Sequence, residues 1–135
     1  MALTATLRQM MRFGAVGLLN TALGLAAIYA CMLFLGLGPE AANVAGYAAG
    51  LSLGFWLNKR WTFASQRRIG DAAMRYGMVM GIAYVVNLAV VSLTARSGMN
   101  PYLAQLCGVA PYTLLSFAGC RFFVFPAAAQ TKPIF

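Results

Sequence analysis

The stretch GFWLNKRWTF, residues 54–63, decides how this chain folds, because an apolar segment runs there into an amide, two cations and an aromatic pair. The tryptophan and phenylalanine that follow the cations suit a membrane interface, where an amphipathic ring lies partly in hydrocarbon. Lys59 and Arg60 suit the headgroup layer. A similar stretch, SFAGCRFFVF, closes the last apolar segment at residues 116–125. The pattern predicts two helices that leave a membrane in the same way.

The composition predicts that lipid is the solvent for most of the chain. Of its 135 residues, 61% are hydrophobic and only 9% are charged, which lies far from the composition of soluble domains. A membrane-spanning helix needs about 20 apolar residues, and no alternation typical of a barrel strand is present. We therefore expect an all-α integral membrane protein, a single domain over residues 1–135 with four transmembrane helices. The expected helices cover residues 13–37, 41–57, 76–95 and 102–125, after a short tail at 1–11.

The sequence repeats itself once along its length. A constant shift pairs residues of the second and fourth expected helices, and a shift of one residue more pairs Arg12-Phe13-Gly14 with Arg75-Tyr76-Gly77. The unit is a two-helix hairpin, which predicts two parallel repeats, 12–63 and 75–125, in one orientation. A cytoplasmic loop, 64–74, would join them, and an unstructured tail would follow at 126–135. The pairs are Pro39 with Pro101, Asn43 with Gln105, Gly46 with Gly108, Gly54 with Ser116, Lys59 with Arg121 and Phe63 with Phe125.

The net charge of the chain is +8, and its positive residues are distributed as in a membrane protein whose orientation they set. The cations lie between apolar segments and form no tract, which argues against a nucleic-acid partner. If four helices cross the membrane, nearly all of the cations fall on one side of it and only Arg96 falls on the other. The positive-inside rule therefore predicts a multi-pass protein of the cytoplasmic membrane with both termini in the cytoplasm. The cations on the cytoplasmic side are Arg8, Arg12, Lys59, Arg60, Arg67, Arg68, Arg75, Arg121 and Lys132. We expect Arg12, Lys59, Arg75 and Arg121 to form a ring at the membrane boundary, with Arg60 as an extra.

Several function classes are disfavoured by residues that the chain does not contain. It has no histidine, and its two acids, Glu40 and Asp71, fall in expected loops, so a proton-coupled exporter of cationic drugs is disfavoured. The three cysteines lack the spacing of metal ligands. Catalysis would need an acid, a base or an activated nucleophile in a pocket. We therefore expect a protein that is not an enzyme, with no catalytic residue, metal or cofactor.

The groups that remain to bind a ligand are the cations at the membrane boundary and the amide and hydroxyl side chains within the expected helices. Arg and Lys bind phosphate, and amides and hydroxyls pair with sugar hydroxyls that are costly to bury in hydrocarbon. This combination suits an anionic lipid with a polar head. Topology alone also produces a boundary ring that binds bulk phospholipid, and the residues leave both readings open.

Four stretches resemble the GtrA-like family of small four-helix membrane proteins. They are Arg12 to Gly17 with Asn20-Thr21, Asn58 to Phe63, Arg75-Tyr76, and Arg121 to Phe125. The chain departs from the family pattern at Lys59, where arginine is usual, and it has Cys120 where the first copy has Asn58.

The resemblance implies translocation of a polyprenyl-phosphate-linked sugar across the cytoplasmic membrane for cell-surface polysaccharide synthesis or modification, beside a membrane glycosyltransferase. We predict a homodimer, or a complex with the transferase, through the glycine face of the second helix. The alternatives are a non-transporting anchor that recruits the transferase and, less favoured, a small drug-exporter-like transporter. The residues expected to bind the phosphate are Arg12, Lys59, Arg60, Arg75 and Arg121, and those expected to guide the sugar are Asn20, Thr21, Asn58 and Asn87.

Overall fold

The computed structural model describes residues 2–127, and the elements that it defines there are all helical. The chain divides into two compact units, the first ending at Ala64 and the second beginning at Ser65. Each unit is a helical hairpin and is described by itself. The long helices are α1 (Ala2–Phe34) and α2 (Pro39–Leu57) in the first unit, and α3 (Ile69–Arg96) and α4 (Pro101–Gly119) in the second.

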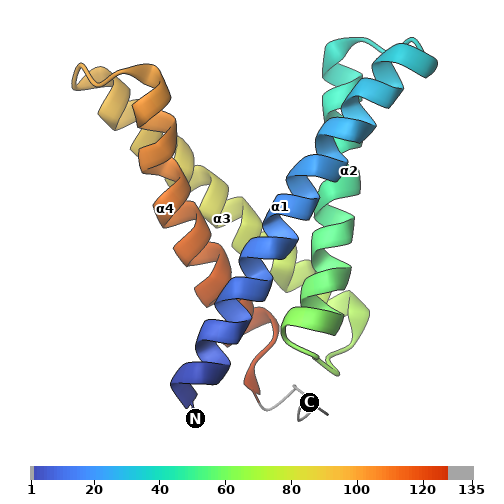
Figure 1. Cartoon of the computed structure of the whole chain (residues 1–135), viewed down its shortest axis with the longest axis vertical. Coiled ribbons are helices and arrows are strands. Elements are labelled where there is room, and N and C mark those ends of the chain that lie inside the picture. Colours follow the sequence, from blue (N-terminus) through green and yellow to red (C-terminus); the bar gives the residue numbers. More distant parts are fainter. Residues whose placement is uncertain (1, 128–135) are drawn as a thin grey trace. The chain divides into compact units, whose positions relative to one another are not determined.

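In the first unit, α1 and α2 run side by side in opposite directions (Figure 1). The turn between them uses Gly36, whose φ of 64° lies in the left-handed region that favours glycine. Pro39 then occupies the first turn of α2, where its missing N–H costs no helical hydrogen bond. The sequence GLGPE therefore ends one helix and starts the next within a few residues.

The glycines of α2 let the two helices of the first unit approach closely. A Cβ added at Gly46 would lie 2.7 Å from the carbonyl oxygen of Gly24 and would also meet the side chain of Ile28. At Gly50 it would lie 3.1 Å from the carbonyl oxygen of Asn20. The glycine face of α2 is thus covered by α1.

This packing corrects the surface that we predicted for a homodimer. Gly46, Gly50 and Gly54 are all buried within the hairpin, so they are not available to a second copy or to a transferase. The physical reason is that the missing side chains of Gly46 and Gly50 let the α1 backbone at Gly24 and Asn20 and the side chain of Ile28 approach α2 closely, and a neighbouring helix of the same chain occupies such a face first. Formation of a homodimer stays a prediction, but not through the glycine face of α2.

The second unit repeats this arrangement with different side chains. Its turn uses Gly98, whose φ is 93°, and the Asn100 side chain caps α4 by accepting a hydrogen bond from the Tyr102 N–H at 2.9 Å. Gly108 of α4 lies against Asn87 and Val91 of α3. Asn87 stands at the position that Gly24 has in the first unit, so an amide side chain meets the glycine of α4 where a glycine backbone meets the glycine of α2.

Both hairpins end in a widened helical turn. α2 continues into the π-helix η1 (Asn58–Thr62), and α4 continues into η2 (Cys120–Val124). Hydrogen bonds five residues apart define them: the Phe63 N–H bonds the Asn58 carbonyl at 2.9 Å, and the Phe125 N–H bonds the Cys120 carbonyl at 2.7 Å. Such turns are rare and leave nearby carbonyls without a helical partner.

Three of the described helices are long and apolar enough to cross a membrane: α1, α3 and the segment Tyr102–Val124. α2 falls short in hydropathy because Pro39, Glu40 and Asn43 lie at its start, although its 19 residues reach about 28 Å, close to the hydrocarbon thickness of about 30 Å. The predicted all-α membrane protein is confirmed.

Several helices begin or end at other residues than the sequence predicts. The segment 1–11 is not a tail, since α1 begins at Ala2, and the good helix formers Ala, Leu, Arg, Gln and Met extend the apolar helix toward the N-terminus. α3 begins at Ile69, so the loop 64–74 is shorter than expected. The predicted unstructured tail, 126–135, lies outside the described residues from position 128 onward.

Candidate functional site

Arg12 of α1 is held against the end of the first hairpin by two interactions with one residue. Its Nη1 donates a hydrogen bond to the carbonyl oxygen of Trp61 at 2.9 Å, and its guanidinium carbon lies 5.1 Å from the centroid of the Trp61 ring. The widened turn of η1 supplies this carbonyl. Trp61, the tryptophan of the motif at residues 54–63, is therefore also the residue that orients Arg12.

Arg75 of α3 makes the same pair of contacts in the second unit. Its Nη1 donates to the carbonyl oxygen of Phe123 at 3.2 Å, and its guanidinium carbon lies 4.6 Å from the centroid of the Phe123 ring. Each contact fixes the first helix of a hairpin to the end of the second. Because a guanidinium has five N–H groups and one is used here, each arginine keeps donors that can bind a phosphate.

The other predicted phosphate ligands lie in the two π-helices. Lys59 and Arg121 are half-buried and occupy the second position of η1 and of η2. Arg60 is exposed and stacks on Trp56, with 4.8 Å between its guanidinium carbon and the ring centroid, and Arg121 stacks on Phe122 at 5.5 Å. Within the first unit, Arg12, Lys59 and Arg60 therefore gather at one end of the hairpin. The ring that would join both repeats stays a prediction.

Asn58 has a structural partner. It is 2% exposed, and its Oδ1 accepts a hydrogen bond from the hydroxyl of Thr62 at 2.9 Å. The corresponding residues of the second unit, Cys120 and Val124, are fully buried and form an apolar pair instead. This burial favours a packing role for Asn58 over the sugar contact that we predicted, which remains untested.

We expect Thr62→Val to destabilise the protein by about 1–3 kcal/mol, because the buried amide oxygen of Asn58 loses its donor. The double variant Asn58→Cys with Thr62→Val, which imports the pair of the second unit, should recover most of this loss because both polar partners are then removed. Unfolding of the purified protein in mixed micelles measures both changes. A double variant less stable than Thr62→Val would contradict this explanation.

Of the other predicted sugar-guiding residues, Asn20 and Asn87 lie at helix contacts and Thr21 does not. Asn20 is half-buried, and its Oδ1 is buried without a hydrogen-bond partner among the described residues. Thr21 is exposed and donates its hydroxyl to the Gly17 carbonyl of its own helix at 3.0 Å. Asn87 is half-buried at the α3–α4 contact, about 18 Å along the helix from Arg75. Asn20 thus offers an unused acceptor, whereas the Thr21 donor is already satisfied locally.

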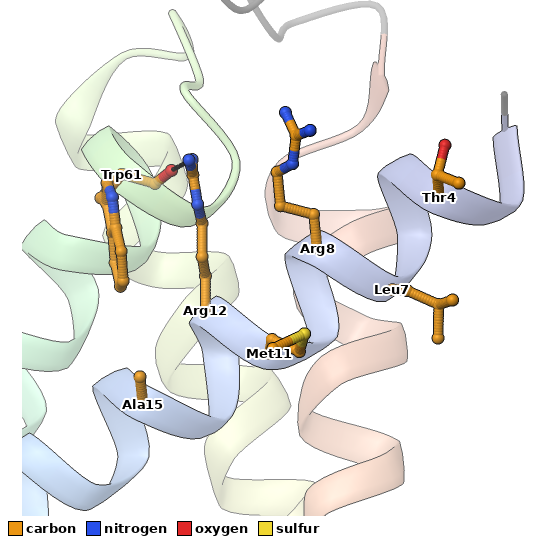
Figure 2. Close-up of a pocket in the computed structure, with 7 residues that line it drawn as sticks. All are labelled: Thr4, Leu7, Arg8, Met11, Arg12, Ala15 and Trp61. Atoms are coloured by element: carbon orange, nitrogen blue, oxygen red, sulfur yellow. Dashed lines mark hydrogen bonds between the residues drawn. The ribbon is translucent and has the colours of Figure 1, made fainter. Parts of the chain in front are cut away.

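An open groove of about 500 Å³ lies on the first unit beside Arg12. Figure 2 shows Arg8 and Arg12 extending to the same side of α1, with Trp61 next to Arg12. The remaining lining is mostly apolar. The groove is lined by Thr4, Leu7, Arg8, Met11, Arg12, Ala15 and Trp61.

Sequence reasoning missed most of this groove because it treated residues 1–11 as a tail. One signal was present: Arg8 and Arg12 are four residues apart, and so are Leu7 and Met11. On a helix these spacings place a cationic row beside an apolar row. Extending the first helix by two or three turns toward the N-terminus would have predicted the surface.

The fold and these contacts define a class: a small helical membrane protein in which an arginine closes each of two hairpins at its aromatic end. The chain matches the model of the GtrA/DPMS transmembrane domain over residues 12–125. It therefore belongs to the GtrA/DPMS transmembrane-domain family, as the resemblance of its motifs implied. No curated protein sequence matches the chain. The match begins at Arg12, so the first two turns of the groove lie outside the shared domain.

Proposed function

We propose that this protein translocates a polyprenyl-phosphate-linked sugar across the cytoplasmic membrane for the synthesis or modification of cell-surface polysaccharide. Family membership supports a membrane protein of polyprenyl-phosphate-sugar processes, and proteins of this kind usually move their substrate without chemical change. The protein is accordingly proposed to be a transporter and not an enzyme.

The observation that carries the proposal is the oriented guanidinium at the aromatic end of each hairpin. Arg12 and Arg75 each use one N–H on a backbone carbonyl and stack on an aromatic ring, so they are held in place before a ligand arrives. Binding then costs less ordering of side chains, and the remaining donors suit phosphate oxygens. Asn20 lies about 12 Å further along α1. Its amide oxygen is buried without a hydrogen-bond partner among the described residues, so it would accept from a sugar hydroxyl only if the helix contact around it opened.

We further propose that the two hairpins are parallel repeats and that α2 crosses the membrane with α1. The paired contacts of Arg12 with Trp61 and of Arg75 with Phe123 support the repeat, and the packing of α2 along α1 supports the crossing. With four crossings, the positive-inside rule places both termini in the cytoplasm. Alkaline phosphatase fused to the C-terminus should then be inactive, and an active fusion would overturn this topology.

The test of transport uses purified protein in liposomes that contain a fluorescent polyprenyl-phosphate hexose. A membrane-impermeant reductant quenches label in the outer leaflet, so the rate at which the remaining label becomes accessible reports translocation. We expect protein-containing liposomes to exceed the protein-free rate at least about ten-fold, a difference of about 1.4 kcal/mol in barrier. A rate equal to that of protein-free liposomes would overturn the proposed function.

A non-transporting anchor for a membrane glycosyltransferase is the second candidate. It is favoured by the use of Arg12 and Arg75 to close their own hairpins, which is a structural task that needs no substrate. An anchor would tolerate Asn20→Ala and Asn87→Ala provided that the helices still pack, whereas a translocase would lose rate. The liposome rate of each variant, measured beside pull-down of the transferase, separates the two candidates, since an anchor retains the transferase without any protein-dependent translocation.

A further inference from the structure

The segment that leads into α3 holds an arginine with an unused hydrogen-bond donor. Arg67 is half-buried and lies two residues before the start of α3. Its backbone N–H donates a hydrogen bond to the Ser65 hydroxyl oxygen at 3.2 Å. Its side-chain Nε, in contrast, is buried and has no hydrogen-bond partner among the described residues. A donor on a charged group is therefore withdrawn from water without an acceptor to replace it.

The unused atom belongs to the part of the side chain that binds oxyanions. Buried polar atoms normally have a partner, and leaving a charged donor without one is especially costly. Nε–H and one Nη–H point the same way from the planar guanidinium, so together they can donate two parallel hydrogen bonds to a carboxylate or a phosphate. An oxyanion would thus satisfy the Nε of Arg67 and use its charge.

The second hairpin does not supply this oxyanion from its own residues. Asp71 is the only acidic residue of the chain after Glu40, and it is exposed on the first turn of α3. It lies four residues after Arg67, yet it does not accept from the Arg67 Nε, since that atom has no partner among the described residues. The acceptor must therefore come from a ligand.

The surroundings of Arg67 favour an anionic ligand. Arg68 is exposed beside it, and Arg75 and Arg121 lie at the same end of the hairpin, where α3 contacts η2. These arginines share that end with one acid, Asp71, and such an excess of positive charge attracts anions. The segment Ile69–Arg96, which is long and apolar enough to cross a membrane, begins here. Phosphate is the anion that the surface of a membrane presents at such a boundary.

We propose that Arg67 binds a phosphate group at the start of α3, with Nε–H and one Nη–H as donors. The phosphate is that of a lipid headgroup or a free phosphate ion, and the choice of phosphate over carboxylate rests on the proposed function. The shift that pairs Arg75 with Arg12 pairs Arg67 with Thr4. This phosphate ligand is therefore particular to the second hairpin.

The test follows the arginine Nε–H groups by NMR. The protein carries arginine that is isotopically labelled at Nε, and it is purified in maltoside micelles, which contain no phosphate. The Arg67 signal is assigned as the one that Arg67→Gln removes. On addition of short-chain phosphatidic acid, we expect the Arg67 Nε–H proton signal to move downfield and to saturate. An Arg67 signal that responds neither to this lipid nor to inorganic phosphate would overturn the proposal.

The matched control is Arg68→Gln, which removes the same charge from an exposed neighbour. In this variant the Arg67 signal should reach the same position at saturation, because the hydrogen bond of Arg67 remains. A response of Arg67 that disappears in Arg68→Gln would show attraction to the general positive charge and would overturn the site.

A stability measurement separates ligand binding from a structural role. Without phosphate, Arg67→Met should have a Tm at least equal to that of the unmodified protein, because it removes an unsatisfied donor. With phosphatidic acid in excess, the unmodified protein and Arg68→Met should gain more in Tm than Arg67→Met, whose affinity should be about ten-fold lower. A lower Tm of Arg67→Met without phosphate, or equal gains for all three proteins, would overturn the proposal.

Inorganic phosphate and dodecanoate identify the source and the chemistry of the ligand. A response to phosphatidic acid at lower concentrations than to inorganic phosphate assigns a lipid headgroup, and the reverse order assigns a free phosphate ion. An equal response of the Arg67 signal to dodecanoate and to phosphatidic acid would overturn the assignment of phosphate, because a carboxylate would then serve as well.

The site and the translocase fail in different experiments. An Arg67 signal that responds to phosphatidic acid, in a protein that gives only the protein-free rate in liposomes, would keep the site and reject the translocase. Translocation by a protein whose Arg67 signal ignores both phosphate ligands would keep the translocase and reject the site.

Discussion

Gly46→Ala should destabilise the first hairpin by about 1–3 kcal/mol, the usual cost of forcing extra atoms into a packed contact. The added methyl group would lie 2.7 Å from the carbonyl oxygen of Gly24 and would also meet the side chain of Ile28. Ile28 can rotate, but the backbone of α1 cannot yield without separating the helices. We expect a lower Tm for the detergent-purified protein and less folded protein in the membrane.

The matched control is Gly14→Ala in α1. No atom lies within 4 Å of a Cβ added there, so the same chemical change should stabilise the helix by about 0.5–1 kcal/mol, the usual preference for alanine over glycine. Equal effects of the two substitutions would show that the close approach of α1 and α2 does not limit stability, and would reopen the glycine face of α2 to another partner.

Arg12→Ala should lower the rate of lipid translocation by about ten-fold or more, because hydrogen bonds to charged groups are worth about 1.5–3 kcal/mol. Arg12→Lys keeps the charge but cannot present two parallel N–H donors to a phosphate, so we expect an intermediate rate. The liposome assay with the fluorescent polyprenyl-phosphate hexose measures both variants, and their Tm values show whether the loss of the bond to the Trp61 carbonyl has unfolded the hairpin.

Arg96→Ala is the control for Arg12, since Arg96 ends α3 at the opposite end of its own hairpin from Phe123. Its rate should equal that of the unmodified protein. If Arg12→Ala folded normally and translocated at the full rate, Arg12 would be left with only its structural task, and the translocase would bind the phosphate through other residues.

The sequence by itself determined the solvent, the helical class and the pairing of elements. The high apolar content requires backbone hydrogen bonds to be satisfied within the chain, which in lipid leaves helices once barrel strands are excluded. Gly36 with Pro39, and Gly98 with Pro101, mark the two turns, because glycine and proline act through local backbone geometry. Four short stretches, among them Asn58 to Phe63, also indicated the family, and the match over residues 12–125 confirms it. All of these signals are local or compositional.

Only the tertiary structure decided which surfaces are used within the chain. A run of glycines at intervals of four predicts close packing but does not name the partner, and the structure assigns Gly46 and Gly50 to α1. The arginine contacts to Trp61 and Phe123 also depend on the neighbouring helix. These contacts join residues nearly 50 positions apart, and neither residue's local propensity encodes where the other lies, so packing alone brings them together.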